Sequence, residues 1–318
     1  MKINSDGVVF GLTNQIPLAK AIAKLLKIRL MPIQKTIFSD GEILVKAGAT
    51  VRNKTAYIIC SLNSHESLME LLLFVDSLKR ASIAKVVVIA TYMCYTRQDR
   101  KASQREGIGA KLVANLLETA GVDKVITFDL HNPSIQGFFN VPVDDLRWIY
   151  PLKRELQKDE KKMKFTIVSP DHGGAVRARK FAELLTTDEI KIAIIDKRRI
   201  GPNKTEIVGL LGNVKDKNCV IIDDIIDTGG TIIKAAEWLK KAGAKKIYLA
   251  ATHGIFSKTF NNFEKCDAID KVLVSDSIPT VRQIKSNKLE IISLDNMIAK
   301  TIDADISSKS ISKLFEKF

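Results

Sequence analysis

The stretch from Val220 to Thr231 reads V-I-I-D-D-I-I-D-T-G-G-T, and it decides how this part of the chain folds. An apolar run stops at two adjacent carboxylates, Asp223 and Asp224, and an amphipathic pattern typical of a helix begins at Thr231. The pattern predicts a buried strand, a tight loop and the N-terminus of a helix. This strand–loop–helix unit is the building block of a parallel α/β sheet.

The loop after that strand combines two opposite chemical properties. Threonine hydroxyls, the open backbone of Gly229 and Gly230, and the helix dipole favour an anion such as phosphate. The carboxylates repel phosphate, but they accept hydrogen bonds from sugar hydroxyls and hold Mg²⁺. A ribose phosphate offers both kinds of group, so we predict a sugar-phosphate site. Its candidate residues are Asp223, Asp224, Asp227, Thr228, Gly229, Gly230 and Thr231. A structural turn without a ligand is the alternative, and the length of the pattern argues against it.

Composition excludes several classes of protein. The chain has 318 residues, enough for two domains, with 46% hydrophobic and 27% charged residues, as in ordinary globular proteins. No apolar run could span a bilayer and no signal peptide is visible, so we expect a cytoplasmic protein without a membrane partner. None of the four cysteines forms a C-x-x-C pair, which disfavours a zinc or redox site. The net charge of +14 comes from dispersed lysines, so we expect it to attract anionic substrates, and nucleic-acid binding is the less favoured alternative.

Strand-like and helix-like segments alternate along both halves of the chain. The expected strands are 8–10, 33–37, 43–45, 56–60, 85–90, 125–128, 165–168, 192–195, 220–222 and 247–251. The expected helices include 68–79, 108–120, 174–185 and 231–242, and one whose first turn holds Pro17. This alternation predicts an α/β fold of two tandem, doubly wound parallel sheets. We place the domains at 1–146 and 147–303, with the tail 304–318 as a candidate to rejoin the first.

Polar motifs follow the apolar strands of the first half, where ligands of such sheets bind. Thr96 to Lys101 reads T-R-Q-D-R-K, and its three cations could clamp a polyphosphate. In Asp129-Leu130-His131, a histidine near a carboxylate could ligate a metal or a metal-bound phosphate. The alternatives are a solvated charged loop and a structural histidine. Phe38 to Glu42, F-S-D-G-E, is a turn signal that is equally consistent with a plain hairpin.

Two further motifs follow strands of the second half. Ser169 to Gly174, S-P-D-H-G-G, offers Asp171 as a candidate metal ligand beside glycines that allow close backbone approach. Asp196 to Arg199, D-K-R-R, is followed by a stretch expected to be a flexible loop. Such a cationic loop could close over a reacting polyphosphate and neutralise charge in the transition state, and a basic surface loop is the alternative. The joint occurrence of all these motifs predicts Mg²⁺-dependent transfer between a polyphosphate and a sugar phosphate.

The motifs together resemble those of the ribose-phosphate pyrophosphokinase (phosphoribosyl diphosphate synthetase) family. The similar segments cover nearly the whole chain and include F-S-D-G-E, R-Q-D-R-K, D-L-H, S-P-D-H-G-G-A-V-R-A-R, D-K-R-R and D-D-I-I-D-T-G-G-T. The resemblance implies two domains of phosphoribosyltransferase type. It also implies transfer of the β,γ-diphosphoryl group of ATP to the 1-hydroxyl of ribose 5-phosphate with Mg²⁺, giving phosphoribosyl diphosphate and AMP for nucleotide biosynthesis.

The resemblance also implies roles for individual residues. The ATP contacts would be Asp40, Gly41, Glu42, Arg97 and Gln98, the first three supplied by a neighbouring subunit. The Mg²⁺ site would contain His131 and Asp171, and Lys197 and Arg199 would be the catalytic cations. Arg199 would also join the sugar-phosphate loop in binding ribose 5-phosphate. Self-association is implied, with a homohexamer expected.

The chain departs from the usual family pattern between Thr91 and Gly109. Thr91 to Thr96 lacks a proline-tyrosine start and 102–104 lacks an arginine. On either side of Ile108, Gly107 and Gly109 stand where the family usually has a proline and a hydroxyl residue. In many members this segment also serves a phosphate or ADP regulatory site, so we expect altered regulation rather than lost catalysis. Two alternatives remain: a phosphoribosyltransferase, which needs only one such domain, and a non-catalytic paralogue, which would be expected to lose catalytic-loop or metal residues.

Overall fold

The chain forms two compact units. The computed structural model describes the backbone of residues 7–160, 164–185, 192–201 and 204–312, and their side chains except those of 159–160, 198–201 and 204–205. Unit 1 comprises Met1–Arg147, Ser277–Pro279 and Ser293–Phe318, and unit 2 comprises Trp148–Asp276 and Thr280–Ile292. The segment that returns to unit 1 therefore begins at Ser293, earlier than the 304–318 that the sequence predicts.

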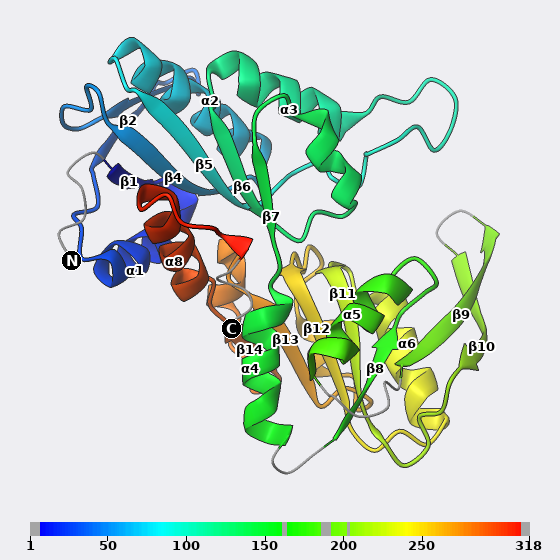
Figure 1. The fold of residues 1–318 in the computed structure, drawn as a ribbon. Coiled ribbons are helices and arrows are strands. Elements are labelled where there is room, and N and C mark those ends of the chain that lie inside the picture. Colours follow the sequence, from blue (N-terminus) through cyan, green and yellow to red (C-terminus); the bar gives the residue numbers. More distant parts are fainter. Residues whose placement is uncertain (1–6, 161–163, 186–191, 202–203, 313–318) are drawn as a thin grey trace. The chain divides into compact units, whose positions relative to one another are not determined.

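Unit 1 is a parallel five-stranded sheet with helices on both faces (Figure 1). Its strands, in spatial order, are β1 (Gly7–Gly11), β4 (Thr55–Ser61), β5 (Lys85–Tyr92), β6 (Lys124–Phe128) and β7 (Val143–Leu146). Its helices are α1 (Ile16–Leu26), α2 (His65–Arg80), α3 (Gly109–Ala120) and α8 (Asp295–Ile306), with short 3-10 turns at Thr13–Gln15 and Pro133–Phe138. Helices α1 and α8 pack together, as do α2 and α3. The central strand β5 is a run of β-branched residues because both of its faces are covered.

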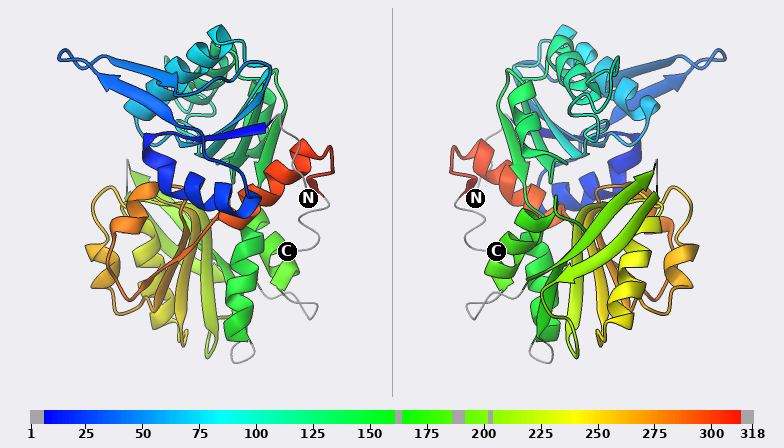
Figure 2. Two further views of the ribbon diagram at one scale, coloured as in Figure 1. Left: turned by 90° about the vertical axis from the view of Figure 1, so that its left-hand side faces the viewer. Right: turned by 90° about the vertical axis from the view of Figure 1, so that its right-hand side faces the viewer.

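A separate hairpin carries the F-S-D-G-E turn. Strands β2 (Ile33–Ile37) and β3 (Ile43–Ala47) pair antiparallel and form a two-stranded sheet of their own. The hairpin projects from the rest of unit 1, as both views of Figure 2 show. Its tip contains Asp40, Gly41 and Glu42, the predicted ATP contacts.

Unit 2 is a seven-stranded sheet in the order β10-β9-β8-β11-β12-β13-β14. Its strands are β8 (Phe165–Ser169), β9 (Ile192–Gly201), β10 (Lys204–Leu211), β11 (Asn218–Ile226), β12 (Ile247–Gly254), β13 (Lys271–Ser275) and β14 (Leu289–Ile292). Its helices are α4 (Ile149–Glu160), α5 (Ala175–Leu185), α6 (Gly230–Lys241) and the short α7 (Asn261–Glu264), with a 3-10 turn at Pro279–Gln283. All strand pairs are parallel except β9–β10. The predicted fold class of two tandem, doubly wound α/β domains is confirmed.

The prediction of a flexible loop after Ile195 is wrong for residues 196–201, which the structure describes. Strand β9 continues through Asp196, Lys197 and Arg199 to Gly201 and pairs with β10, so this segment is a β-ribbon rather than a flexible loop. Strand β8 pairs with β9 only as far as Ile194, so the rest of β9 is held by β10 alone. Residues 202–203, at the turn, lie outside the described part of the chain.

No helix in the described part of the chain is both long enough and apolar enough to cross a bilayer. The cytoplasmic location stays a prediction.

Candidate active site

The strand–loop–helix unit from Val220 onwards lies in the middle of unit 2. Strand β11 runs further than the sequence predicts, to Ile226, and so includes both Asp223 and Asp224. It pairs with β8 only up to Ile221, whereas its pairing with β12 continues to Ile226. One edge of β11 is therefore released just before the two carboxylates, and the strand end is available for a site.

The two carboxylates share one cation. Arg177 on α5 donates through Nη1 to Asp223 Oδ1 at 3.0 Å and to Asp224 Oδ1 at 3.1 Å. Asp224 is almost fully buried, with 5% of its side chain exposed, and Asp223 is 30% exposed. Burial, followed by the charge of Asp224, raises the pKa of Asp223 to about 8, although Arg177 opposes the rise.

The predicted catalytic lysine is close enough to this pair to sense its charge. Lys197 on β9 has a buried Nζ with no hydrogen-bond partner among the described residues. Burial lowers the pKa of Lys197, and the charges of Asp171 and Asp223 oppose that lowering. The structure thus brings Lys197, Asp171 and Asp223 into one electrostatic neighbourhood. The side chain of Arg199 lies outside the described residues, and its backbone pairs with Thr205 in the ribbon.

The sugar-phosphate loop has a defined geometry. Asp227 Oδ1 accepts hydrogen bonds from Ser257, at 3.2 Å from the backbone N and 2.5 Å from Oγ. Gly229 has a φ of +82° and precedes the first residue of α6. A Cβ at this position would collide with the ring of Phe263, so both the conformation and the space require glycine. The N-cap Gly229 places no side chain over the first turn of α6, which suits an anion site.

Asp171 occupies the loop that follows β8. Its Oδ1 accepts from the backbone N of Gly174 at 2.9 Å, and its carbonyl oxygen accepts from Ser169 Oγ at 2.6 Å. The neighbouring His172 contacts Asp196 Oδ1 through Nε2 at 3.0 Å. These bonds join the S-P-D-H-G-G loop to the start of the ribbon.

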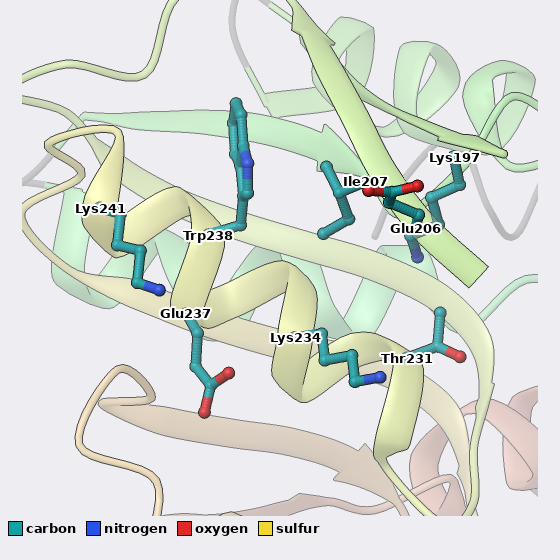
Figure 3. A pocket seen from close by; sticks show the side chains of 8 residues that line it. All are labelled: Lys197, Glu206, Ile207, Thr231, Lys234, Glu237, Trp238 and Lys241. Atoms are coloured by element: carbon teal, nitrogen blue, oxygen red, sulfur yellow. The ribbon is translucent and has the colours of Figure 1, made fainter. Parts of the chain in front are cut away.

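A hollow of about 280 Å³ opens beside this neighbourhood (Figure 3). Its lining comes from the ribbon and from α6, namely Lys197, Glu206, Ile207, Thr231, Lys234, Glu237, Trp238 and Lys241. Thr231 of the predicted phosphate loop and the predicted catalytic Lys197 therefore line one hollow.

The remaining predicted residues lie in unit 1. Asp40 Oδ1 accepts from the backbone N of Glu42 at 3.0 Å, and Gly41 has a φ of +92°, so the hairpin tip is a tight turn. Gln98 N donates to the carbonyl of Tyr95 at 2.9 Å in the loop after β5, which also holds Arg97. His131 follows β6 in unit 1, whereas Asp171 belongs to unit 2. Within the described residues, no three His, Cys, Asp or Glu side chains form a ready-made metal site.

Three contacts of the site are not foreseen from the sequence. Arg177 and Ser257 lie far along the chain from the carboxylates they bind, and Asp196 is recognised only as part of a basic motif. For Arg177 a signal exists, since it stands one turn after the glycines of S-P-D-H-G-G on a predicted helix. For Ser257 we find no sequence signal that would place it beside Asp227.

Comparison with known proteins decides the family. A model described as the N-terminal domain of ribose phosphate pyrophosphokinase matches residues 7–121, and one described as the phosphoribosyl synthetase-associated domain matches 199–316. The ribose-phosphate pyrophosphokinase of Mycoplasmopsis pulmonis is 51% identical over 98% of this chain and 97% of its own. The chain belongs to the ribose-phosphate pyrophosphokinase family. A Fusobacterium nucleatum relative of the same name is 42% identical over 98% of this chain and 99% of its own.

A solved structure agrees with this family. The crystal structure of phosphoribosylpyrophosphate synthetase from Mycobacterium smegmatis matches with a TM-score of 0.88 and 33% identity, over 96% of this chain and 100% of that one. The resemblance that the motifs indicate is confirmed, and so is the prediction that the chain is an enzyme, a ribose-phosphate diphosphokinase.

Proposed function

We propose that the protein transfers the β,γ-diphosphoryl group of ATP to the 1-hydroxyl of ribose 5-phosphate, producing phosphoribosyl diphosphate and AMP with Mg²⁺. The observation that carries this proposal is the neighbourhood of unit 2. Lys197, a cation without a hydrogen-bond partner among the described residues, feels the charges of Asp171 and of Asp223 on β11. A phosphate-type loop follows β11 at once.

Ribose 5-phosphate would bind at the loop between β11 and α6. The backbone N–H groups at Gly229 and Gly230 and the hydroxyls of Thr228 and Thr231 suit the 5-phosphate at the N-terminus of α6. The carboxyl groups of Asp223 and Asp224 suit the ribose hydroxyls, because carboxyl oxygens accept hydrogen bonds and a sugar hydroxyl can donate them. Asp227, which accepts hydrogen bonds from Ser257, would fix the loop between the phosphate site and the ribose site.

Lys197 would act on the charge that develops during transfer. A lysine ammonium that lacks a fixed partner can direct its charge at the transferring group without first breaking an internal bond. Its position in a β-ribbon rather than a loose loop lowers the reorganisation that this requires. Arg199, two residues further along the same strand, would be the second cation.

The residues present fit a magnesium ion. Asp223 and Asp224 are hard oxygen donors on one strand, of the kind that Mg²⁺ prefers. Asp171, on the loop after β8, is the ligand candidate of the S-P-D-H-G-G motif. Asp223 and Asp224 would hold the ion, which would supply positive charge that neutralises the phosphates of the substrates. We keep His131 as a further candidate ligand, together with Asp171.

ATP would be held by Arg97 and Gln98 of unit 1. Asp40, Gly41 and Glu42, at the tip of the projecting hairpin, would reach the ATP of a neighbouring subunit, so the proposal includes self-association as a homohexamer. The hairpin's exposed Ile37 and Phe38 support a contact there, since 68% and 47% of these residues are open to solvent.

The deciding experiment measures AMP release from ATP and ribose 5-phosphate with Mg²⁺. We expect AMP and phosphoribosyl diphosphate in equal amounts and neither product without ribose 5-phosphate. Base-dependent release of diphosphate without AMP would instead identify a phosphoribosyltransferase. Size-exclusion chromatography with light scattering tests the hexamer separately.

A further inference from the structure

The β9–β10 ribbon and helix α6 line one hollow, and none of the roles above explains its two apolar lining side chains, Ile207 and Trp238. We propose that Ile207 and Trp238 form a latch that positions the Nζ of Lys197 beside the ribose 5-phosphate loop. This inference rests on the proposed function, since it concerns how the catalytic lysine is held.

The ribbon couples Ile207 directly to Lys197. In the antiparallel ladder Ile207 is the residue opposite Lys197, so movement of one backbone position moves the other. The register shifts immediately afterwards, because Gly209 rather than Val208 is opposite Asp196. Such a bulge bends a ribbon and re-aims side chains, and it is common next to active sites.

Helix α6 provides the other half of the latch. Thr231, Lys234, Trp238 and Lys241 are spaced by three, four and three residues, so they share one face of the helix. That face lines the hollow with Lys197 and Ile207, as Figure 3 shows. Ile207 and Trp238 are each partly buried against the hydrophobic core of unit 2.

Lys197 depends on this support because it lacks other anchors among the described residues. Its Nζ has no hydrogen-bond partner there, and β9 has no strand other than β10 beside it at this position. The position of the ammonium group is therefore set by the ribbon. In the proposed latch the ribbon is held over α6 by Ile207 and Trp238, which line the hollow and pack against the core of unit 2.

Steady-state kinetics of Ile207→Ala and Trp238→Ala test the latch. We expect kcat to fall about 10- to 100-fold in each variant, as for a small misplacement of a catalytic group, while KM for ribose 5-phosphate stays within about twofold. Trp238→Phe keeps an aromatic ring and should recover most of kcat. The matched control is Leu211→Ala, an exposed apolar residue of the same strand, opposite Ile194 and outside the hollow.

A double-mutant cycle separates positioning from a merely structural role. Lys197→Ala alone should lower kcat about 100-fold, as loss of a charge-stabilising group does. If Ile207 acts through Lys197, adding Ile207→Ala to that variant should change kcat by less than about twofold. The intrinsic fluorescence of Trp238, obtained by subtracting the spectrum of the Trp238→Phe variant, should shift to the red in Ile207→Ala.

Distinct results overturn the two proposals. Wild-type protein that releases no AMP would contradict the proposed function. Active wild-type protein with an Ile207→Ala variant of normal kcat would contradict the latch, and so would multiplicative losses in the double variant. If Ile207→Ala does not fold, Ile207→Val serves the same purpose and should give an intermediate kcat with the same non-additivity.

Discussion

Gly229 is the single residue on which the shape of the sugar-phosphate loop depends most. Gly229→Ala forces a non-glycine residue into a left-handed conformation and pushes a methyl group against Phe263. We expect a loss of about 1–3 kcal/mol in the free energy of unfolding, from the backbone strain alone, and a raised KM for ribose 5-phosphate. Urea denaturation and initial-rate kinetics measure the two effects. Gly230→Ala, where the added Cβ meets nothing within 4 Å, is the stability control and should unfold at the wild-type midpoint.

Arg177 stabilises the neighbouring carboxylates of Asp223 and Asp224 by binding both of them. Arg177→Ala leaves Asp223 and Asp224 side by side without their shared cation. Because the pair is only partly buried, we expect a loss of about 2–4 kcal/mol, somewhat below that of a fully buried ion pair. Arg177→Lys keeps the charge but not the planar geometry, so its stability should lie between those of the wild type and Arg177→Ala. Equal unfolding midpoints for wild type and Arg177→Ala at pH 7 would show that the pair needs no cation.

The raised pKa of Asp223 predicts a pH dependence. Folded protein holds a proton on Asp223 up to about pH 8, whereas the unfolded chain releases it in the ordinary range of aspartate. The contribution to stability is therefore present at low pH and is lost as pH rises toward 8. We expect Asp223→Asn to flatten this slope, measured by urea denaturation between pH 5 and about pH 8.5. Mg²⁺ should stabilise the wild type more at pH 8 than at pH 6, since it competes with that proton; equal stabilisation at both would argue against Asp223 as a magnesium ligand.

Among the elements, strands that form continuous apolar runs are predictable from the sequence, whereas the polar part of β9 is not. β5, β6, β8, β11 and β12 are recognised because burial on both faces makes each of them a continuous apolar run. Strand β9 is predicted only to Ile195, since beyond that point its residues are polar. What keeps that part extended is its pairing with β10, and the sequence does not reveal long-range pairing.

The same physical limit applies to the site. Residues on strand ends and glycine loops, such as Asp223 and Gly229, are found because a local pattern places them. Arg177 and Ser257 act across gaps of 46 and 30 residues, and only the fold brings them to Asp223 and Asp227. The sequence therefore predicts which loops form the site, but not which side chains orient their carboxylates.

The β2–β3 hairpin is an element that needs an anchor, because it is not part of the main sheet. Lys35 Nζ donates to Glu70 Oε2 at 2.6 Å, and Thr13 Oγ1 donates to Glu70 Oε1 at 2.6 Å, while Glu70 is nearly buried. Lys35→Met removes the hairpin's share of this network and should raise KM for ATP severalfold, because the tip carries Asp40 to Glu42. Hydrogen–deuterium exchange should increase in 33–47. Lys46→Met, an exposed lysine on the same hairpin, is the control, and equal exchange in both variants would exclude the anchor.

At the scale of the whole molecule, unit 1 is built from both ends of the chain. Helix α8 returns to it from beyond unit 2, and its Asp305 accepts from Tyr57 Oη at 2.8 Å and from Lys124 Nζ at 2.7 Å. Asp305→Ala would leave the hydroxyl of the buried Tyr57 without this acceptor and remove one of the carboxylates around Lys124. We expect unit 1 to lose about 2–4 kcal/mol of stability.

The stability of unit 2 should change far less in Asp305→Ala, and intrinsic tryptophan fluorescence can measure it. Both tryptophans of the chain, Trp148 and Trp238, belong to unit 2, so tryptophan fluorescence reports the unfolding of that unit. Hydrogen–deuterium exchange of β1 and α1 reports unit 1. In Asp305→Ala the exchange of β1 and α1 should rise well below the denaturant concentration at which the fluorescence changes, because the two units have separate cores. Ser308→Ala, an exposed position beyond the end of α8, should leave both transitions in place. A fluorescence midpoint that shifts together with the exchange would mean that the units unfold as one cooperative body and that Asp305 stabilises the whole chain.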